Sequence, residues 1–371
     1  MHEENQGSDD NIDAGGAAPA GSTGTPAAGS GMLPPRPRVV REPTIAAVDD
    51  GYGMIKVVTK DGKWKIPSRA RVGAHGVATI GVKTANQAPD AASLDNGYET
   101  EGTPYTVSAD VEGEGTRFND YPVSGLNRVL VQHGLRLAGL SGKQVKIVTG
   151  LPVNDYFSGD TRNVDKINRK IESLMKPVRA LDPTGKVATV VENHVCAEGV
   201  AAWIDRVLDN KGRQLVNFAQ PAAVVDIGGR TTDCVLVLPG FKVDFARSGT
   251  GDIGVLRLYD SVKRRVHARH KVEMPVVALE QAVITGQIML WGKTHDVSDL
   301  VKEAKREVSE MILREVQRRI GDTYDLHEVL IVGGGAVLFD NIRQAFPNAN
   351  VPEDPEFANA RGMLKYLMYV A

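Results

Sequence analysis

One short pattern occurs twice in this chain: an apolar strand ends in an aspartate, and a glycine-rich turn follows it. The first copy occupies residues 49–56, DDGYGMIK, after the apolar run 45–48. The second copy, about 180 residues later, occupies residues 226–233, DIGGRTTD, after the run 222–225. Apolar residues follow each copy, so each is expected to form two strands joined by a tight turn. Two such units in one chain indicate an internal duplication of an α/β fold.

The chemistry of these turns suits a phosphate chain. Glycines allow a tight turn to present backbone N–H groups to an anion, Lys56 can reach a phosphate oxygen, and Thr231 adds a hydroxyl donor. Facing each other, the two turns would hold phosphates from both sides, and Asp49 and Asp226 would hold the waters of a Mg²⁺ ion. Asp50 competes with Asp49 for that role, but neighbouring strand residues point to opposite faces, which favours Asp49.

A third glycine-rich segment follows the apolar run Val329–Val332 and consists of Gly333, Gly334 and Gly335. Glycines there allow a ligand to approach the backbone closely, and a helix is expected to begin near Val337. The segment is neither a dinucleotide fingerprint nor a Walker A loop, because it lacks the G-x-G-x-x-G and Gly-Lys-Ser/Thr patterns.

The other apolar patterns alternate between strands and helices in both halves. Between Leu300 and Ile320 apolar residues recur at steps of three and four, which predicts a long amphipathic helix. The other expected helices are 126–140, 160–174, 199–208 and 360–369, and the other expected strands include 55–58, 145–148, 187–191 and 234–238.

Residues 1–43 differ in composition from the rest. They are rich in Gly, Ala, Pro and Ser, which predicts a disordered tail. The basic end of this tail, residues 34–41, is either a solvated leader or an arm that binds a partner or DNA weakly. A net charge of −2 gives no electrostatic argument for nucleic-acid binding. No apolar run reaches the length of a membrane span, so a cytoplasmic protein without membrane contact is expected.

In this order, the motifs D-x-G-x-G-x-x-K, D-I-G-G-x-T-x-D and V-G-G-G-A resemble those of the actin-like ATPase superfamily, which includes actins, heat-shock chaperone ATPases and sugar kinases. From about residue 44 onward the chain looks most like the ParM/StbA plasmid-segregation actins, and among these it resembles the kind encoded in PRTRC plasmid clusters. Three stretches outside the nucleotide motifs carry this narrower resemblance: 66–69 (IPSR), 148–152 (VTGLP) and 357–362 (FANARG).

The resemblance implies a fold and a division of the chain. The fold would be α/β and actin-like, a duplicated ribonuclease H-like architecture with two lobes and a nucleotide cleft between them. Residues 44–220 would form lobe I, residues 221–351 lobe II, and residues 352–371 would return to lobe I. The expected ligands are ATP and Mg²⁺.

The resemblance also assigns roles to single residues. Asp49 and Asp226 would position Mg²⁺ through water, and Lys56 would contact phosphate. Tyr52 stands where eukaryotic actins have a serine, which puts one hydroxyl contact to the γ-phosphate in question. The phosphate turns would be formed by Gly51, Gly53, Gly228 and Gly229 with Thr231 as a further donor, and the adenosine pocket by Gly333, Gly334 and Gly335.

A catalytic carboxylate is expected just before a helix between the two phosphate motifs, and Glu198 occupies that place. It would orient a water in line with the γ-phosphate, although a glutamate there could also simply favour the start of a helix. Glu192 is the reserve candidate. On the long helix, Lys302 and Arg306 would either stack over the adenine or belong to a solvated face.

The expected function is that of an ATPase whose ATP-bound form assembles into filaments and whose hydrolysis times their disassembly. Its partners would be further copies of itself and a centromere-binding adaptor of the ParR type, with plasmid DNA contacted only indirectly. The alternative is a small-molecule kinase, which requires an aspartate base near the cleft. Asp155 or Asp160 could be argued for that role.

Overall fold

The computed structural model describes residues 42–73, 96–109, 113–216 and 219–371. Nearly all of the predicted tail therefore lies outside the described residues. By its internal contacts, Glu42–Ala371 forms one compact unit.

The first sheet has the strand order β11-β7-β1-β2-β3. β1 (Thr44–Asp50) is antiparallel to β2 (Met54–Thr59), which pairs with β3 (Gly62–Pro67). β1 is parallel to β7 (Gln144–Leu151), which is parallel to β11 (Thr189–Ala197). Because the carboxyl ends of parallel strands meet at one edge, the segments that follow β1, β7 and β11 gather there.

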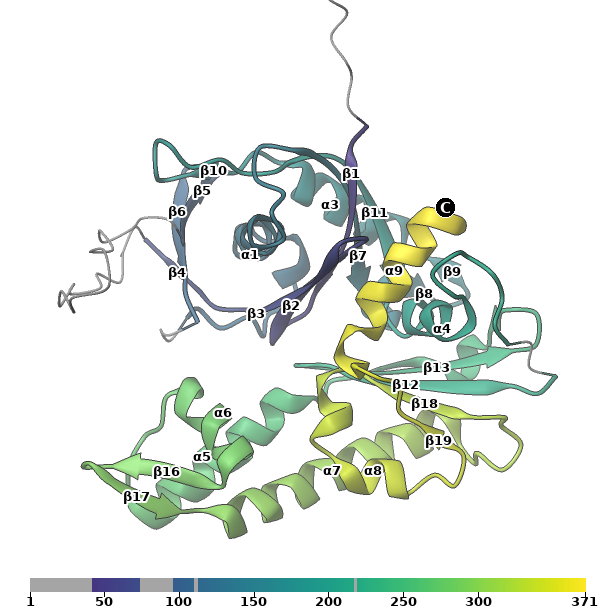
Figure 1. Ribbon diagram of the computed structural model, residues 1–371. Coiled ribbons are helices and arrows are strands. Elements are labelled where there is room, and N and C mark those ends of the chain that lie inside the picture. The colour runs from purple at the N-terminus through teal and green to yellow at the C-terminus, as the bar shows by residue number, and fades with distance from the viewer. Residues whose placement is uncertain (1–41, 74–95, 110–112, 217–218) are drawn as a thin grey trace, which may run out of the picture. The chain divides into compact units, whose positions relative to one another are not determined.

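A smaller sheet completes this half of the unit. It has the order β10 (Arg179–Ala180), β5 (Gly97–Thr100), β6 (Thr103–Val107) and β4 (Ala70–Val72). Helix α1 (Gly125–Leu137) lies between the two sheets and packs on strands of both (Figure 1). Helix α3 (Val164–Met175) packs against β11.

The third sheet repeats the local arrangement of the first. β12 (Ala222–Ile227) is antiparallel to β13 (Thr232–Leu238) and parallel to β18 (Val329–Val332), as β1 is to β2 and β7. Every residue of β12 is buried, because helices cover both faces of the sheet. β14 (Lys242–Val243), β15 (Gly249–Gly251) and β19 (Ala349–Asn350) extend this sheet.

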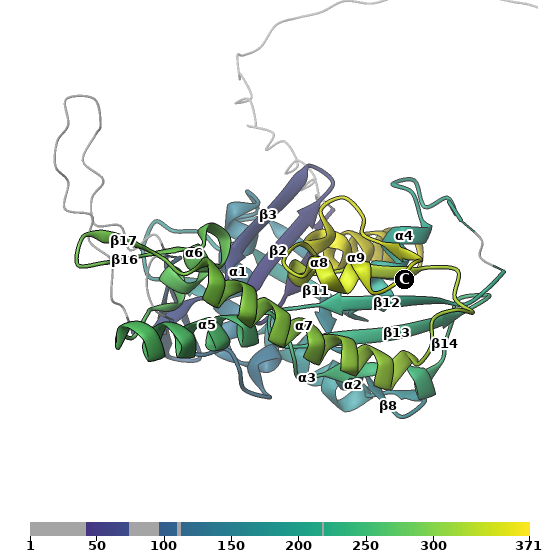
Figure 2. The same ribbon diagram turned by 90° about the horizontal axis from the view of Figure 1, so that it is seen from below.

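Alternate residues of β12 belong to two separate cores. Ala223, Val225 and Ile227 pack with α5 (Val255–His270) and α7 (Ser298–Ile320). Ala222 and Val224 pack with α4 (Val200–Val207) on the opposite face. Figures 1 and 2 show α7 running along one face of this sheet while α4 lies on the other.

The C-terminal segment returns to the first sheet. After the short turn η5 (Pro355–Phe357), helix α9 (Ala358–Tyr369) packs on β1, β2, β7 and α4. Its approach to α4 requires a glycine, because a Cβ atom at Gly362 would lie 1.7 Å from the carbonyl oxygen of Ala201.

The remaining elements are short or peripheral. They include α6 (Val276–Thr285) and the hairpin of β16 (Gln287–Leu290) and β17 (Lys293–Asp296), which pack near α5 and α7. The others are η2 (Tyr121–Val123), α2 (Val153–Tyr156), β8 (Phe157–Ser158), β9 (Thr161–Arg162), η3 (Phe245–Arg247), η4 (Gly334–Val337) and α8 (Asp340–Gln344). No helix in the described ranges combines the length and apolar character needed to cross a bilayer.

Several expected boundaries are wrong. The helix expected over 160–174 begins only at Val164, because the Asn163 side chain accepts the N–H of Lys166 and residues 157–162 form a hairpin. The strand expected over 187–191 continues to Ala197. The helix expected near Val337 is instead the 3₁₀ turn η4, and α8 begins only at Asp340. The helix α6 and the hairpin β16–β17 were not anticipated.

Candidate functional site

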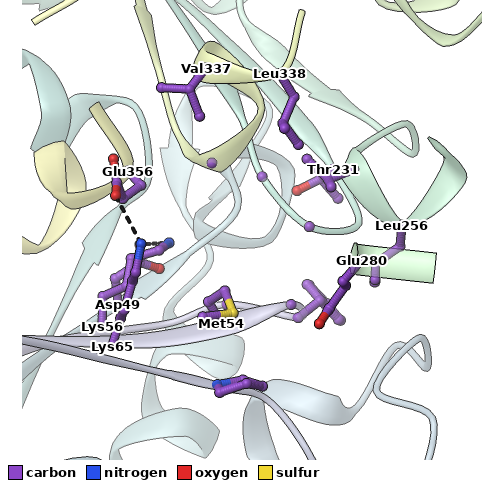
Figure 3. A pocket seen from close by; sticks show the side chains of 18 of the residues that line it. Asp49, Met54, Lys56, Lys65, Thr231, Leu256, Glu280, Val337, Leu338 and Glu356 are labelled. Carbon is purple, nitrogen blue, oxygen red and sulfur yellow. Dashed lines mark hydrogen bonds and ion pairs between the residues drawn. The ribbon is translucent and has the colours of Figure 1, made fainter. Parts of the chain in front are cut away.

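A cavity of about 320 Å³ lies where the carboxyl ends of β1 and β12 approach each other. Its wall includes the β1–β2 turn, the β12–β13 turn, η4 and one side each of α5 and α6 (Figure 3). Ten of the residues singled out from the sequence line it: Asp49, Gly51, Gly53, Lys56, Glu198, Asp226, Gly228, Gly229, Thr231 and Gly334.

The β1–β2 turn lines this cavity, and its carbonyls are held by hydrogen bonds. The Ser68 hydroxyl donates to the carbonyl of Gly51 at 2.7 Å, and the Ser68 N–H donates to that of Gly53 at 2.9 Å. The Thr116 hydroxyl donates to the carbonyl of Tyr52 at 2.7 Å. Within the described ranges, none of the N–H groups of Gly51, Tyr52 and Gly53 has a hydrogen-bond acceptor. These N–H groups are therefore available to an anion.

The β12–β13 turn is fastened by the start of α5. The N–H groups of Val255 and Leu256 donate to the carbonyls of Gly228 and Gly229 at 3.0 and 2.8 Å. The turn also touches the β1–β2 turn directly, because a Cβ atom at Gly229 would lie 2.6 Å from the backbone nitrogen of Gly53. Two glycine turns in backbone contact can bind the same phosphate chain from opposite sides.

Carboxylates accumulate behind the turns. The ammonium group of Lys56 donates to Asp49 at 2.7 Å, and both side chains are buried. Burial alone would lower the pKa of Lys56, but Asp49 raises it above its usual value. Asp50 does not line the cavity and pairs instead with the buried Lys170 at 2.8 Å. Strand alternation thus separates the two neighbouring aspartates.

Asp226 lies at the end of β12 and accepts a hydrogen bond from the side-chain amide of Asn359. Burial, followed by repulsion from Asp233 and Asp49, raises the pKa of Asp226 to about 7. Asp233 does not line the cavity, because its carboxylate accepts from the N–H of Val153 at 2.7 Å and from threonine hydroxyls.

A divalent cation fits this arrangement. Asp49, Asp226 and Glu198 line one cavity and repel one another, so an added cation would relieve their repulsion. Among the described residues, no three His, Cys, Asp or Glu side chains converge closely enough to hold a metal directly. Mg²⁺ suits such a site, because it keeps most of its waters when bound by one or two carboxylates.

Glu198 follows β11 immediately and opens on the cavity. Its N–H donates to the carbonyl of Leu151 at 2.9 Å, which fixes the residue beside the end of β7. A Cβ atom at Gly150 would lie 3.0 Å from Oε1 of Glu198 and 2.6 Å from Cε of Met363, so glycine leaves room for both side chains. Burial, and then repulsion from Asp49 and other aspartates, raises the pKa of Glu198 well above its usual value.

The three consecutive glycines after β18 have different roles. Gly333 has a φ of +83°, and a Cβ atom there would lie 2.4 Å from Oδ1 of Asp226. A Cβ atom at Gly335 would lie 2.2 Å from Cγ2 of Ile227, so this glycine allows packing against the strand. Only Gly334 lines the cavity, with open space at its Cβ position.

The structure does not bring the other candidates to the cavity. Glu192 lies on the exposed side of β11, where it pairs with Lys146 at 2.7 Å and with His194. Lys302 and Arg306 are exposed on α7, because the apolar stripe of that helix faces the core, and neither lines the cavity.

Helix α6 instead supplies the side chains that line this part of the wall. Glu280, Gln281 and Ile284 reach the cavity from α6, and Leu256 and Tyr259 reach it from α5. The spacing 280, 281 and 284 is that of one helix face. The only signal in the sequence was the polar pair Glu280-Gln281 inside the otherwise apolar run 276–284.

Ion pairs connect the two sides of the cavity mouth. Lys65 on β3 lies 3.2 Å from Glu356 on η5, an ion pair marked in Figure 3. Arg69 pairs with Glu280 on α6, and it also donates to the carbonyl of Ala109 at 2.8 Å. These contacts join segments of the first half of the unit to elements that follow β12.

Two sheets of the same local topology, each ending in an aspartate and a glycine turn at a shared cavity, define the fold of an actin-like ATPase. A family model of the N-terminal domain of actin-like proteins matches residues 47–200. A second model, of the C-terminal domain of the archaeal actin homologue MreB-like, matches residues 224–344. The two matches together span well over half of the chain, which therefore belongs to the actin-like proteins, and the predicted fold class is confirmed.

Solved structures have the same fold. An archaeal actin homologue, Ta0583, is 19% identical, with a TM-score of 0.69 over 88% of this chain and 99% of its own. A ParM from a 15-stranded filament of Clostridium botulinum is 20% identical, with a TM-score of 0.70 over 87% of this chain and 98% of its own. Ta0583 has also been solved in complex with ADP. That structure is 20% identical, with a TM-score of 0.69 over 88% of this chain and 99% of its own. A comparison with curated proteins gives no match.

Proposed function

We propose that this protein hydrolyses ATP, assembles into filaments in its ATP-bound state, and acts in plasmid segregation as the resemblance to ParM/StbA implies. The carrying observation is the backbone contact between Gly229 and Gly53, which places two anion-binding turns at one cavity. Among proteins of this fold, one was solved with ADP and another as a filament. Both observations concern those relatives and support the proposal by analogy.

The proposed chemistry assigns a task to each lining group. Backbone N–H groups of the two turns bind the phosphate oxygens, together with Lys56 and Thr231, and Gly334 lies against the nucleoside. Mg²⁺, when bound, neutralises phosphate charge, and Asp49 and Asp226 hold its waters. In this proposal residues 44–220 form lobe I, residues 221–351 form lobe II, and residues 352–371 return to lobe I.

Glu198 orients the attacking water in this proposal. Within the described residues its carboxylate has no hydrogen-bond donor, so it is free to accept one from water. Its raised pKa favours the protonated form of the carboxyl group. A bound cation would favour the carboxylate form of Glu198, which is the form that accepts a hydrogen bond from water.

The partners follow from the same proposal. Further copies of the chain form the filament, an adaptor of the ParR type links it to plasmid DNA, and the protein works in the cytoplasm without membrane contact. The small-molecule kinase is less well supported, because neither proposed aspartate base lines the cavity. Asp155 pairs with Lys166, and Asp160 is exposed in the turn between β8 and β9.

Light scattering and phosphate release, measured together over a range of protein concentrations, test the proposal. We expect a threshold concentration with ATP, no assembly with ADP, and phosphate release that follows assembly. GTP in parallel samples determines the base preference. Steady hydrolysis without scattering at any concentration would contradict the filament and favour an enzyme of small molecules. Absence of nucleotide binding would refute the whole proposal.

A further inference from the structure

The side chain of Asn359 connects two parts of the cavity wall that come from different sheets. Asn359 lies in the first turn of α9 and is buried, with 5% of its surface exposed. Its Oδ1 accepts the N–H of Gly199 at 3.0 Å, and its Nδ2 donates to Oδ2 of Asp226. A backbone N–H can only donate and a carboxylate accepts, so the two partners fix the orientation of the amide.

The contact with Gly199 controls the turn that carries Glu198. Gly199 has a φ of +74°, and a Cβ atom there would lie 2.7 Å from Cγ2 of Val235, so the turn needs glycine on two grounds. The N–H of Glu198 is held by the carbonyl of Leu151, and the next N–H is held by Asn359. The backbone of Glu198 is thus fastened on both sides, once within the first sheet and once by α9.

The contact with Asp226 fixes a carboxylate at the end of β12. One of its oxygens receives the Asn359 amide, and the other lies against the backbone of Gly333. The carboxylate therefore has little freedom to rotate. One amide on α9 links this group to the backbone of the acid on the opposite side of the cavity.

We propose that Asn359 is a positioning residue that fixes the Asp226 carboxylate and the backbone of Glu198 relative to each other. It thereby determines where the water bound to Glu198 lies relative to the phosphates. This inference rests on the proposed ATP hydrolysis. It assigns Asn359 no contact with the reacting atoms, and so predicts a larger effect on turnover than on nucleotide binding.

The residues around Asn359 hold it rigidly, as such a role requires. Arg361 donates to Oδ2 of Asp205 on α4 at 2.8 Å and to the carbonyl of Asp354 at 3.0 Å. Gly362 allows α9 to touch α4, and Ala360 is fully buried. The stretch 357–362, which is part of the family resemblance, thus holds the Asn359 side-chain amide in a fixed position.

Two substitutions test the proposal. Asn359→Asp keeps an oxygen for the N–H of Gly199 but places a second carboxylate against Asp226. Asn359→Ala removes both contacts without adding a charge, so it remains informative if the aspartate variant fails to fold. For both variants we expect kcat for ATP to fall about 10- to 100-fold, the usual effect of losing a group that orients a metal-site carboxylate. The affinity for ADP without Mg²⁺ should stay within about threefold, while the gain in affinity on adding Mg²⁺ shrinks.

Asn350→Asp is the matched control. The Asn350 amide donates to Oε2 of the buried Glu328 at 2.9 Å, on the same sheet as Asp226 but outside the cavity wall. The change therefore places a carboxylate against a buried carboxylate, as at residue 359. We expect it to lower the melting temperature and to leave kcat and the Mg²⁺ gain unchanged.

The outcomes separate this inference from the proposed function. If the wild type hydrolyses ATP and both folded Asn359 variants keep its kcat and its Mg²⁺ gain, the positioning role is refuted and the function stands. If the wild type does not hydrolyse ATP, the proposed function fails. The increase in ADP affinity on adding Mg²⁺ then still tests whether Asn359 orients Asp226. If this increase is the same in the wild type and in both variants, the contact between Asn359 and Asp226 has no such role.

Discussion

Replacing Asp226 by asparagine should make the nucleotide-free protein more stable while it weakens nucleotide binding. The pKa of Asp226 is raised to about 7 by burial and by Asp233 and Asp49, against an ordinary value of about 3.9 in an unfolded chain. The folded state therefore binds this proton more tightly than the unfolded state does. The resulting stability is fully present below about pH 4 and is lost as the pH rises through about 7.

The size of the effect follows from the shift. About three pKa units at about 1.4 kcal/mol each give an upper bound near 4 kcal/mol. Because Asp226 and its neighbours share this repulsion, we expect about half, roughly 2 kcal/mol at pH 8. Asparagine is neutral at every pH, and its Oδ1 can still accept the hydrogen bond of Asn359. The substitution should therefore raise the melting temperature by roughly 3–6 °C at pH 8 and change it little at pH 4.5.

Thermal unfolding with a chelator at both pH values measures this gain, and titration with Mg·ATP measures the loss. We expect Mg·ATP affinity to fall by about 2–3 kcal/mol, the value of a charge-assisted contact in a partly buried site. Asp205→Asn is the control, because Asp205 is partly buried and paired with Arg361 and Lys365, so the same change should destabilise. A lower melting temperature for Asp226→Asn at pH 8, or an equal gain at both pH values, would refute the reasoning.

Three further predictions concern other parts of the molecule. Because the pKa of Glu198 is raised and its carboxylate form orients the water, the rate of phosphate release should increase with pH. Glu198→Gln should release phosphate about 10²–10⁴-fold more slowly and lose this pH dependence, and a pH–rate profile checks both. Gly362→Ala should cost about 3 kcal/mol or more in a denaturant melt, whereas Gly334→Ala, with open space at its Cβ position, should cost little. Trp291, at the tip of the β16–β17 hairpin, has 80% of its surface exposed, so Trp291→Ser should weaken pelleting with ATP while nucleotide affinity stays unchanged.

The two phosphate turns were predictable because their chemistry is local. A strand-end aspartate, the following glycines and the returning strand are consecutive in sequence, and the placement of Asp49 rather than Asp50 in the cavity follows from strand alternation. The recurrence of the pattern then implied two similar halves. The fold class could be predicted for the same reason, since it depends on the order of such local units.

Other parts of the site depend on contacts between distant segments, which no local pattern reveals. Asn359 meets Asp226 across 133 positions of sequence. The sequence left open whether Lys302 and Arg306 reach the nucleotide or lie on a solvated face, because periodicity identifies α7 but not which neighbouring helix lines the cavity. The strand before Glu198 was predicted too short because a bulge between Val190 and Glu192 interrupts the alternation of its side chains.

The packing of α9 on β1, β2 and β7 also has a consequence for how the chain is made. The ribosome synthesises β1 first, but the helix that covers Ala47 and Val148 comes from residues 358–369. After α4 has been synthesised, roughly 160 residues must follow, which takes about 10–30 s at 5–20 residues per second. Throughout that interval the face of the first sheet that carries Ala47 and Val148 lacks α9, so nascent chains of this protein should depend on chaperones late in translation.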